Sequence, residues 1–141
     1  MWLSYLGVSA LLLTSGCGRD DTLSYAEVGG TVSLGGKPLV GVVVEFYPIV
    51  PVGKEGLPSS RGMTDGSGQY QLTCVNDQTG AVVGPHRVVV RWPAAVRNPD
   101  APPSPRTRPV IPLAYTVARD SPLKVEVIPE RRVYDLNLSP R

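Results

Sequence analysis

Residues 28–47 read VGGTVSLGGKPLVGVVVEFY, and this stretch decides the fold class of the chain. Apolar residues alternate with polar or small ones over residues 28–34 and again over residues 42–47, which is typical of half-buried strands. Between the two segments, Gly35-Gly36 favours a tight turn, because glycine reaches positive φ without strain. Pro48 ends the second strand, since proline cannot donate to a sheet ladder. The residues expected to face the core are Val28, Val32, Leu34, Val42, Val44 and Phe46.

Five later segments show the same alternation. They span residues 61–64, 69–74, 86–92, 123–127 and 133–138. Their inward-facing side chains are expected to be Tyr70, Leu72, Cys74, Val88, Val90, Trp92, Tyr134, Leu136 and Leu138. Glycine and proline number 15 each among 141 residues, which excludes a helical bundle because both are poor in helix interiors. We therefore expect an all-β domain, a seven-stranded Greek-key β-sandwich without a long helix.

A strong turn signal, Asp65-Gly66-Ser67-Gly68, separates two of these segments and predicts a hairpin between them. The Asp65 carboxylate can accept hydrogen bonds from turn amides, and Gly68 supplies a conformation that a bulky residue resists. We interpret Asp65, Gly66 and Gly68 as a structural turn. A calcium loop is disfavoured there, because the segment lacks repeated carboxylates.

The first 17 residues have the layout of an export signal. Residues 1–16 carry no charged side chain and hold an apolar run, Leu6 to Leu13, that is short for a membrane span of about 20 residues. The small residues Ser15-Gly16 before Cys17 resemble the bacterial lipobox, in which the chain is cut before the cysteine and its sulfur receives a diacylglycerol. The resemblance implies a signal peptide over residues 1–16 and lipidation of Cys17. An ordinary signal peptide or an N-terminal core strand are the alternatives.

This resemblance implies a protein anchored through lipid to a membrane of the cell envelope, facing the periplasm or the outside. Residues 17–27 are then expected to form a polar tether, and residues 28–141 the folded domain. With Cys17 lipidated, Cys74 has no disulfide partner, and its place in an alternating segment predicts a buried, inert thiol.

Residues 93–112 contain seven prolines, which a regular strand cannot tolerate because each proline removes a backbone donor. They predict a long excursion that docks back at residues 111–115. The excursion carries Arg97, Arg106 and Arg108. Since loops often carry binding residues, we expect an interaction loop for an envelope protein or a polysaccharide. A solvated loop without a partner is the alternative.

Charge and histidine content limit the functions open to the chain. Lys and Arg number 14 and Asp and Glu number 12, a net charge of +2 without the dense basic patch of a nucleic-acid-binding protein. His86 is the single histidine and no His-x-x-Glu is present, so we expect no metal site and no cofactor. His86 is expected to be a strand-face residue.

Three motifs, in this order, resemble the carboxypeptidase regulatory-like domains, a transthyretin-like sandwich common in secreted bacterial proteins. The first runs from Val28 to Phe46, the second is TDGSGQY at residues 64–70, and the third is GPHRVVV at residues 84–90. In the third motif His86 stands where an aromatic residue is usual. The resemblance covers about residues 28–138. It implies an accessory domain without the zinc-bearing catalytic part of carboxypeptidases.

We therefore expect a non-enzymatic, lipid-anchored envelope protein that serves as an interaction or structural module. A carbohydrate-binding module is the main alternative, with Tyr47, Trp92 and Tyr115 as rings that stack on sugars. A transthyretin-like hydrolase is a remote alternative. That family needs several histidines and a C-terminal Tyr-Arg-Gly-Ser, whereas this chain ends LSPR at residues 138–141.

Overall fold

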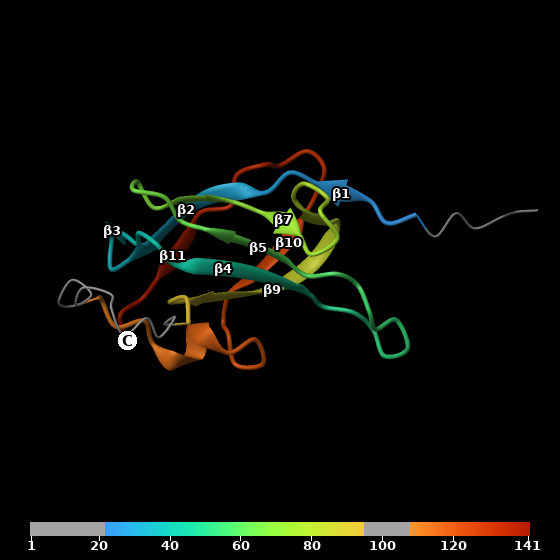
Figure 1. The fold of residues 1–141 in the computed structure, drawn as a ribbon. Helices are drawn as coiled ribbons and strands as arrows, with labels where there is room; N and C mark the ends of the chain where they lie inside the picture. The colour runs from blue at the N-terminus through green and yellow to red at the C-terminus, as the bar shows by residue number, and fades with distance from the viewer. Residues whose placement is uncertain (1–21, 95–107) are drawn as a thin grey trace, which may run out of the picture.

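The computed structural model describes residues 22–94 and 108–141, and the regular secondary structure of this part is almost entirely β-strand (Figure 1). The strands are β1 (Tyr25–Ala26), β2 (Gly29–Leu34), β3 (Lys37–Pro38), β4 (Val43–Pro48), β5 (Ser60–Met63), β6 (Gln69–Gln71), β7 (Thr73–Cys74), β8 (Ala81–Val82), β9 (Gly84–Arg91), β10 (Lys124–Val127) and β11 (Leu136–Leu138). The helical part of the described residues is one 3₁₀ turn, η1 (Leu113–Thr116). The prediction of an all-β chain is confirmed.

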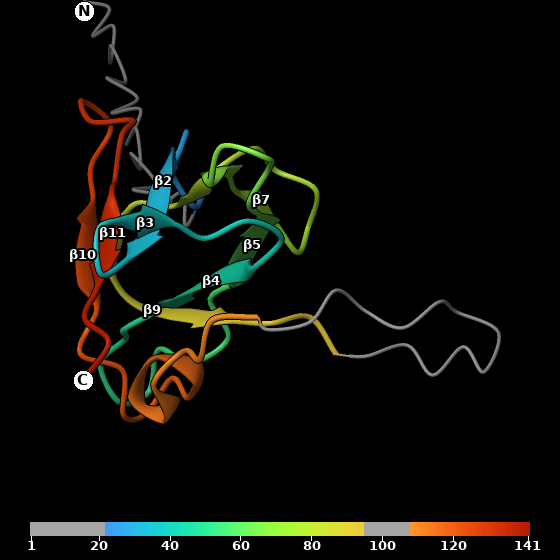
Figure 2. The same ribbon diagram turned by 90° about the vertical axis from the view of Figure 1, so that its left-hand side faces the viewer.

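Two sheets face each other and enclose the core (Figures 1 and 2). One sheet has the strand order β10-β9-β4-β5-β7, and all its neighbours are antiparallel. The other is built around β2, which pairs in parallel with β11 and antiparallel with β3 and β6. A third, two-strand pairing joins β1 to β8. The arrangement is sandwich-like.

The hairpin expected between residues 61–64 and 69–74 forms only in part. β5 pairs with β7, but β6 leaves that sheet and pairs with β2 in the opposite one. Gly62 permits the crossing, because a Cβ at this position would overlap the carbonyl oxygen of Gln71. The segment 69–74 therefore belongs to both sheets. This split, together with several two-residue strands, gives eleven strand segments in the described part of the chain, where seven strands were expected.

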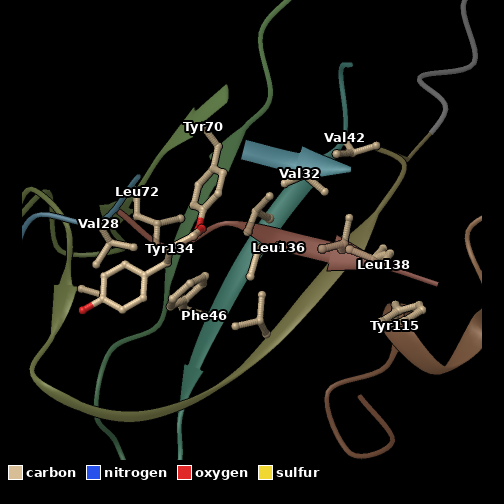
Figure 3. Close-up of a cluster of buried hydrophobic side chains, with 14 of the residues drawn as sticks. Val28, Val32, Val42, Phe46, Tyr70, Leu72, Tyr115, Tyr134, Leu136 and Leu138 are labelled. Carbon is tan, nitrogen blue, oxygen red and sulfur yellow. The ribbon is translucent and has the colours of Figure 1, made fainter. Parts of the chain in front are cut away.

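The core lies between the sheets and contains most of the residues that alternation predicts, whereas Leu34, also expected there, is only partly buried (Figure 3). Phe46 and Tyr70 come from opposite sheets, and their ring centroids lie 6.4 Å apart. The hydroxyl of Tyr70 donates to the carbonyl of Tyr134 at 2.6 Å, so this buried polar group is satisfied. Trp92 packs half-buried against the core. The fully inward residues are Val28, Val32, Val42, Val44, Phe46, Tyr70, Leu72, Cys74, Val88, Val90, Tyr134, Leu136 and Leu138.

The folded body begins before residue 28. Tyr25 and Ala26 pair with β8, Ala26 is buried, and the carbonyl of Ser24 accepts a hydrogen bond from the Val83 amide at 2.8 Å. The segment 17–27, expected as a polar tether, therefore contributes a strand at its C-terminal end. The described residues contain no helix of the length and apolar character that a membrane crossing needs.

The long strand β9 connects two opposite ends of the molecule. Its eight residues span roughly 26 Å. At the start of β9, the Val83 amide donates to the Ser24 carbonyl, and the Ile49 amide donates to the Pro85 carbonyl. We call this the tether end. At its finish, the Trp92 indole N–H donates to the carbonyl of Pro109 at 3.1 Å, and we call this the far end. Because Met63 pairs with Val43, which pairs with Arg91, the turn that follows β5 also lies at the far end.

Candidate functional site

The turn at residues 65–68 is held by the Asp65 carboxylate. Its Oδ1 accepts from the backbone amides of Ser67 at 2.8 Å and Gln69 at 3.0 Å. The backbone of Asp65 closes the turn, because its carbonyl accepts from Gly68 and its amide donates to Gln69. The carboxylate is used within the turn and has the arrangement of an Asx-type structural motif.

The two glycines of this turn differ. Gly68 has φ of +77°, and a Cβ there would stand 2.8 Å from the Pro38 Cβ and 3.1 Å from the Val32 carbonyl oxygen. Gly66 does not have a positive φ, and a Cβ at this position would meet open space. The structure therefore gives Gly68 a steric and conformational role, and gives Gly66 none.

The arms of the proline-rich excursion meet at the far end. The Arg108 guanidinium lies 5.1 Å from the centroid of the Trp92 ring, an arrangement that gives a cation–π attraction. Ile111 and Tyr115 are buried, as the expected docking of residues 111–115 predicts, and the Tyr115 hydroxyl accepts from the Ser139 amide at 3.0 Å. Of the three arginines expected on this loop, Arg97 and Arg106 lie outside the described residues.

The three aromatic residues considered for sugar stacking do not form a common platform. Tyr115 is buried in the core. Trp92 is half-buried, with Arg108 over its ring. Tyr47 is partly exposed on the outer side of β4, and its hydroxyl donates to the Glu45 carboxylate at 3.2 Å.

The sequence did not predict an ion pair that lies on the outer side of the five-stranded sheet. The Arg91 guanidinium donates twice to the Glu45 carboxylate, through Nε at 3.0 Å and through Nη2 at 2.9 Å. These bonds lower the pKa of Glu45 and raise that of Arg91, while burial and the neighbouring Glu45 raise the pKa of Tyr47. The two residues stand diagonally across β4 and β9, so only the strand register could have revealed the pair.

Two shallow hollows flank the sheets. One lies beside the ion pair and is lined by Val43, Arg61, Met63, Thr73, Val75 and Arg91 among others. The other lies over β2 and β6 and is lined mostly by backbone and polar side chains, including Thr31, Gln69, Gln71, Arg132 and Asp135. The second hollow also carries the carboxylates of Glu27 and Asp65, so charged groups line both hollows.

His86 lies inward on β9, on the face that alternation assigns to it, and is 1% exposed. Its Nδ1 lies 3.0 Å from the Gly84 carbonyl oxygen, and its ring centroid lies 5.8 Å from that of Phe46. Its Nε2 has no hydrogen-bond partner. Burial lowers the pKa of His86, with a smaller opposing effect from the Gly84 carbonyl and the Glu126 carboxylate. The imidazole is therefore enclosed by the core and stays neutral near pH 7.

Cys74 is a buried free thiol whose Sγ donates to the Ser59 carbonyl at 3.3 Å. Cys17, the expected lipidation site, lies outside the described residues. Within residues 22–94 and 108–141, no three side chains among His, Cys, Asp and Glu stand together as a metal-binding group would require.

Comparison of the chain with protein-family models, with curated proteins and with solved structures found no match.

Proposed function

We propose that this chain is a non-enzymatic protein of the cell envelope, anchored to a membrane through lipid on Cys17, whose β-domain presents an interaction surface away from the membrane. Its fold is a Greek-key β-sandwich of the carboxypeptidase regulatory-like type. The two facing sheets and the three motifs quoted above support this assignment. An envelope protein or an envelope polysaccharide is the partner.

The order of features at the N-terminus carries the proposal. An apolar run ends at Ser15-Gly16-Cys17, and the folded body begins within eight residues of that cysteine, at β1. The chain thus places an acylation motif, a short polar link and a domain in succession. Cys74, the other cysteine, is buried beneath Ser59, so it does not compete for modification.

The surroundings of the titratable groups support a function without catalysis. The imidazole of His86 is enclosed beside Phe46. The carboxylate of Glu45 is held by both Arg91 and Tyr47. A general base needs access to a substrate proton, and these two groups are engaged within the structure instead.

The far end is the proposed interaction surface. Both described arms of the proline-rich excursion, Trp92–Ala94 and Arg108–Ile111, lie there, at the end of β9 remote from Ser24. These arms therefore lie on the side of the domain opposite the proposed anchor. Its prolines favour extended backbone at low entropic cost, and its arginines suit acidic or polar partners.

The test is Cys17→Ala in the full chain, with Cys74→Ala as the matched cysteine control. Detergent partitioning and the mass of the mature protein are measured for both. We expect Cys17→Ala to lose the acyl mass and to move to the aqueous phase, while Cys74→Ala keeps the mass and the membrane attachment. A Cys17→Ala protein that is cut at the same place and stays membrane-bound contradicts the proposal.

A further inference from the structure

The segments that meet at the tether end carry exposed apolar side chains, and the far end carries others, among them Met63 and Val110. The loop from β4 to β5 carries Val52, which is 99% exposed at its tip, and Ile49, which is 40% exposed. Val75 in the turn after β7 is 62% exposed, and Leu23 just before β1 is 41% exposed. The Val52 side chain buries almost no area within the domain, so its burial in an apolar environment outside the domain would be favourable.

Hydrogen bonds tie these segments to the place where the N-terminal chain enters the domain. The loop starts at Ile49, whose amide donates to Pro85, two residues after the Val83 amide that donates to Ser24. The loop finishes at Ser59, whose carbonyl accepts from Val75 at 3.0 Å. Next to Val75, the Asn76 side-chain amide donates to the hydroxyl of Tyr25 at 2.7 Å. The loop, the turn and the entry of the chain therefore form one end of the molecule, and Figure 1 shows the loop and the chain entry on the same side.

The length of the link fixes how far this end can stand from a membrane anchor at Cys17. Seven residues, 18–24, separate Cys17 from Tyr25. Even fully extended they reach roughly 25 Å. The link therefore keeps Tyr25 within roughly 25 Å of the bilayer surface, a distance comparable to the length of β9.

The loop has the composition of a segment that settles into a lipid interface. Pro51 and Pro58 flank its apolar tip and limit its backbone freedom. Glu55 accepts from the Gly53 amide at 2.8 Å, which ties its carboxylate to the loop. Lys54 follows Val52 closely and, among the described residues, takes part in no ion pair. A lysine stem can bury along apolar surface while its ammonium group stays with the phosphates.

We propose that the loop 49–59 rests in the headgroup layer of the bilayer, with the Val52 side chain inserted, and that this contact orients the domain with its far end away from the membrane. The inference rests on the proposed anchor at Cys17. The loop contacts the lipid surface, because the anchor and the short link keep that surface within reach of the tether end.

The experiment uses the full chain, isolated with its acyl modification and returned to vesicles of phosphatidylethanolamine and phosphatidylglycerol. Val52→Cys carries an environment-sensitive fluorophore, and Val110→Cys at the far end, where Val110 is 84% exposed, is the matched control. Cys17 is blocked by acylation and Cys74 is buried, so each variant takes a single label. We expect a nitroxide-bearing lipid to quench the label at residue 52 several-fold more than the label at residue 110, and aqueous iodide to do the reverse.

The outcomes separate this inference from the proposed function. If the mass of the isolated chain shows no acyl group, the proposed lipidation of Cys17 is wrong, and the proposed orientation of the domain is wrong too. If the chain is acylated but both labels respond alike to both quenchers, the anchor stands and the orientation is overturned. If the label at residue 52 is shielded from iodide yet not reached by the lipid quencher in native envelope membranes, a protein covers the loop, and the lipid contact is again overturned.

Discussion

Both ends of the domain are closed by backbone hydrogen bonds between distant segments, such as Ser24 with Val83 at the tether end and Gly41 with Thr64 at the far end. The far end adds the Asp65 carboxylate, which accepts from two amides of its turn. The tether end depends on a close backbone approach, because a Cβ at Gly80 would overlap the Ala26 carbonyl. Added bulk is therefore expected to cost most at the tether end, whereas the far end depends more on residue identity.

The largest effect is expected from bulk at the tether end. Gly80 has φ of +88°, donates to the Leu72 carbonyl at 2.8 Å, and would place a Cβ inside the carbonyl group of Ala26. Gly80→Ala must therefore push β1 away from β8, in addition to straining the backbone. We expect the free energy of unfolding, from urea titration, to fall by about 2–4 kcal/mol.

Gly53→Ala is the matched control for Gly80→Ala. Gly53 has the same φ of +88°, but a Cβ there meets open space. Only the backbone strain remains, on the order of 1–2 kcal/mol. Equal losses in the two variants would mean that the close approach of β1 to residue 80 contributes nothing.

Gly68→Val tests the far end and is expected to cost about 1–3 kcal/mol through strain at positive φ and contact with Pro38. Gly66→Ala, two residues away, should leave the melting temperature unchanged, because Gly66 has an ordinary φ and open space beside it. An unchanged melting temperature in Gly68→Val, or a large loss in Gly66→Ala, would show that the turn is held in another way.

The inward faces of the strands were predictable because alternation is a local property. Val42, Val44 and Phe46 are fully buried, and Tyr70, Leu72 and Cys74 nearly so. These assignments follow from spacing alone, since neighbouring side chains of a strand point to opposite faces. The turn at Asp65 was predictable for the same reason, because its hydrogen bonds stay within five residues.

Pairing partners were not predictable, since they depend on segments far apart in sequence. β6 was expected beside β5, yet it pairs with β2, and the missing side chain of Gly62 makes room for the crossing. β1 was overlooked because two residues carry no readable period. The Glu45–Arg91 pair was missed because its diagonal geometry arises only from the register of β4 and β9. Cys17, Arg97 and Arg106 stay predictions, and so do the anchor and the interaction surface.

Acid should weaken the tether end through His86, which lies across from Pro48 and beside Gly84. Burial lowers the pKa of His86 in the folded protein, so the unfolded chain, near its ordinary 6.5, binds the proton first. The free energy of unfolding therefore falls as the pH drops below about 6.5, until the lower folded-state pKa is reached. Glu126 is the carboxylate that opposes this shift, and Phe46 is the ring against which the imidazole packs.

His86→Phe removes this titration and places an aromatic ring where the resembled family has one. At pH 7.5 we expect the free energy of unfolding to change by about 1 kcal/mol or less, because the volume is nearly kept. Between pH 7 and pH 5 the urea midpoint of the unchanged protein should fall, while that of His86→Phe should stay nearly level. Parallel pH dependences in the two proteins would assign the acid sensitivity to carboxylates instead.

The smallest effect on stability is expected at the far end, from deletion of Asp100 to Thr107. The deletion keeps Arg108 over Trp92, and these arms already lie close together, so the five residues 95–99 can close the gap. Shortening a flexible connection changes its closure entropy by less than about 1 kcal/mol, in the stabilising direction. Capture of envelope partners by the immobilised protein should fall sharply, most of all at low salt, where the deleted Arg106 attracts partners over a longer range.

Arg108→Ala is the companion variant: it keeps the excursion and removes the cation above Trp92, at a cost of about 0.5–1 kcal/mol. If the deletion unfolds the domain, the excursion is packed structure. If it leaves the captured proteins and polysaccharides unchanged, the partner binds elsewhere, and the hollow beside Arg61 and Met63 becomes the next surface to alter.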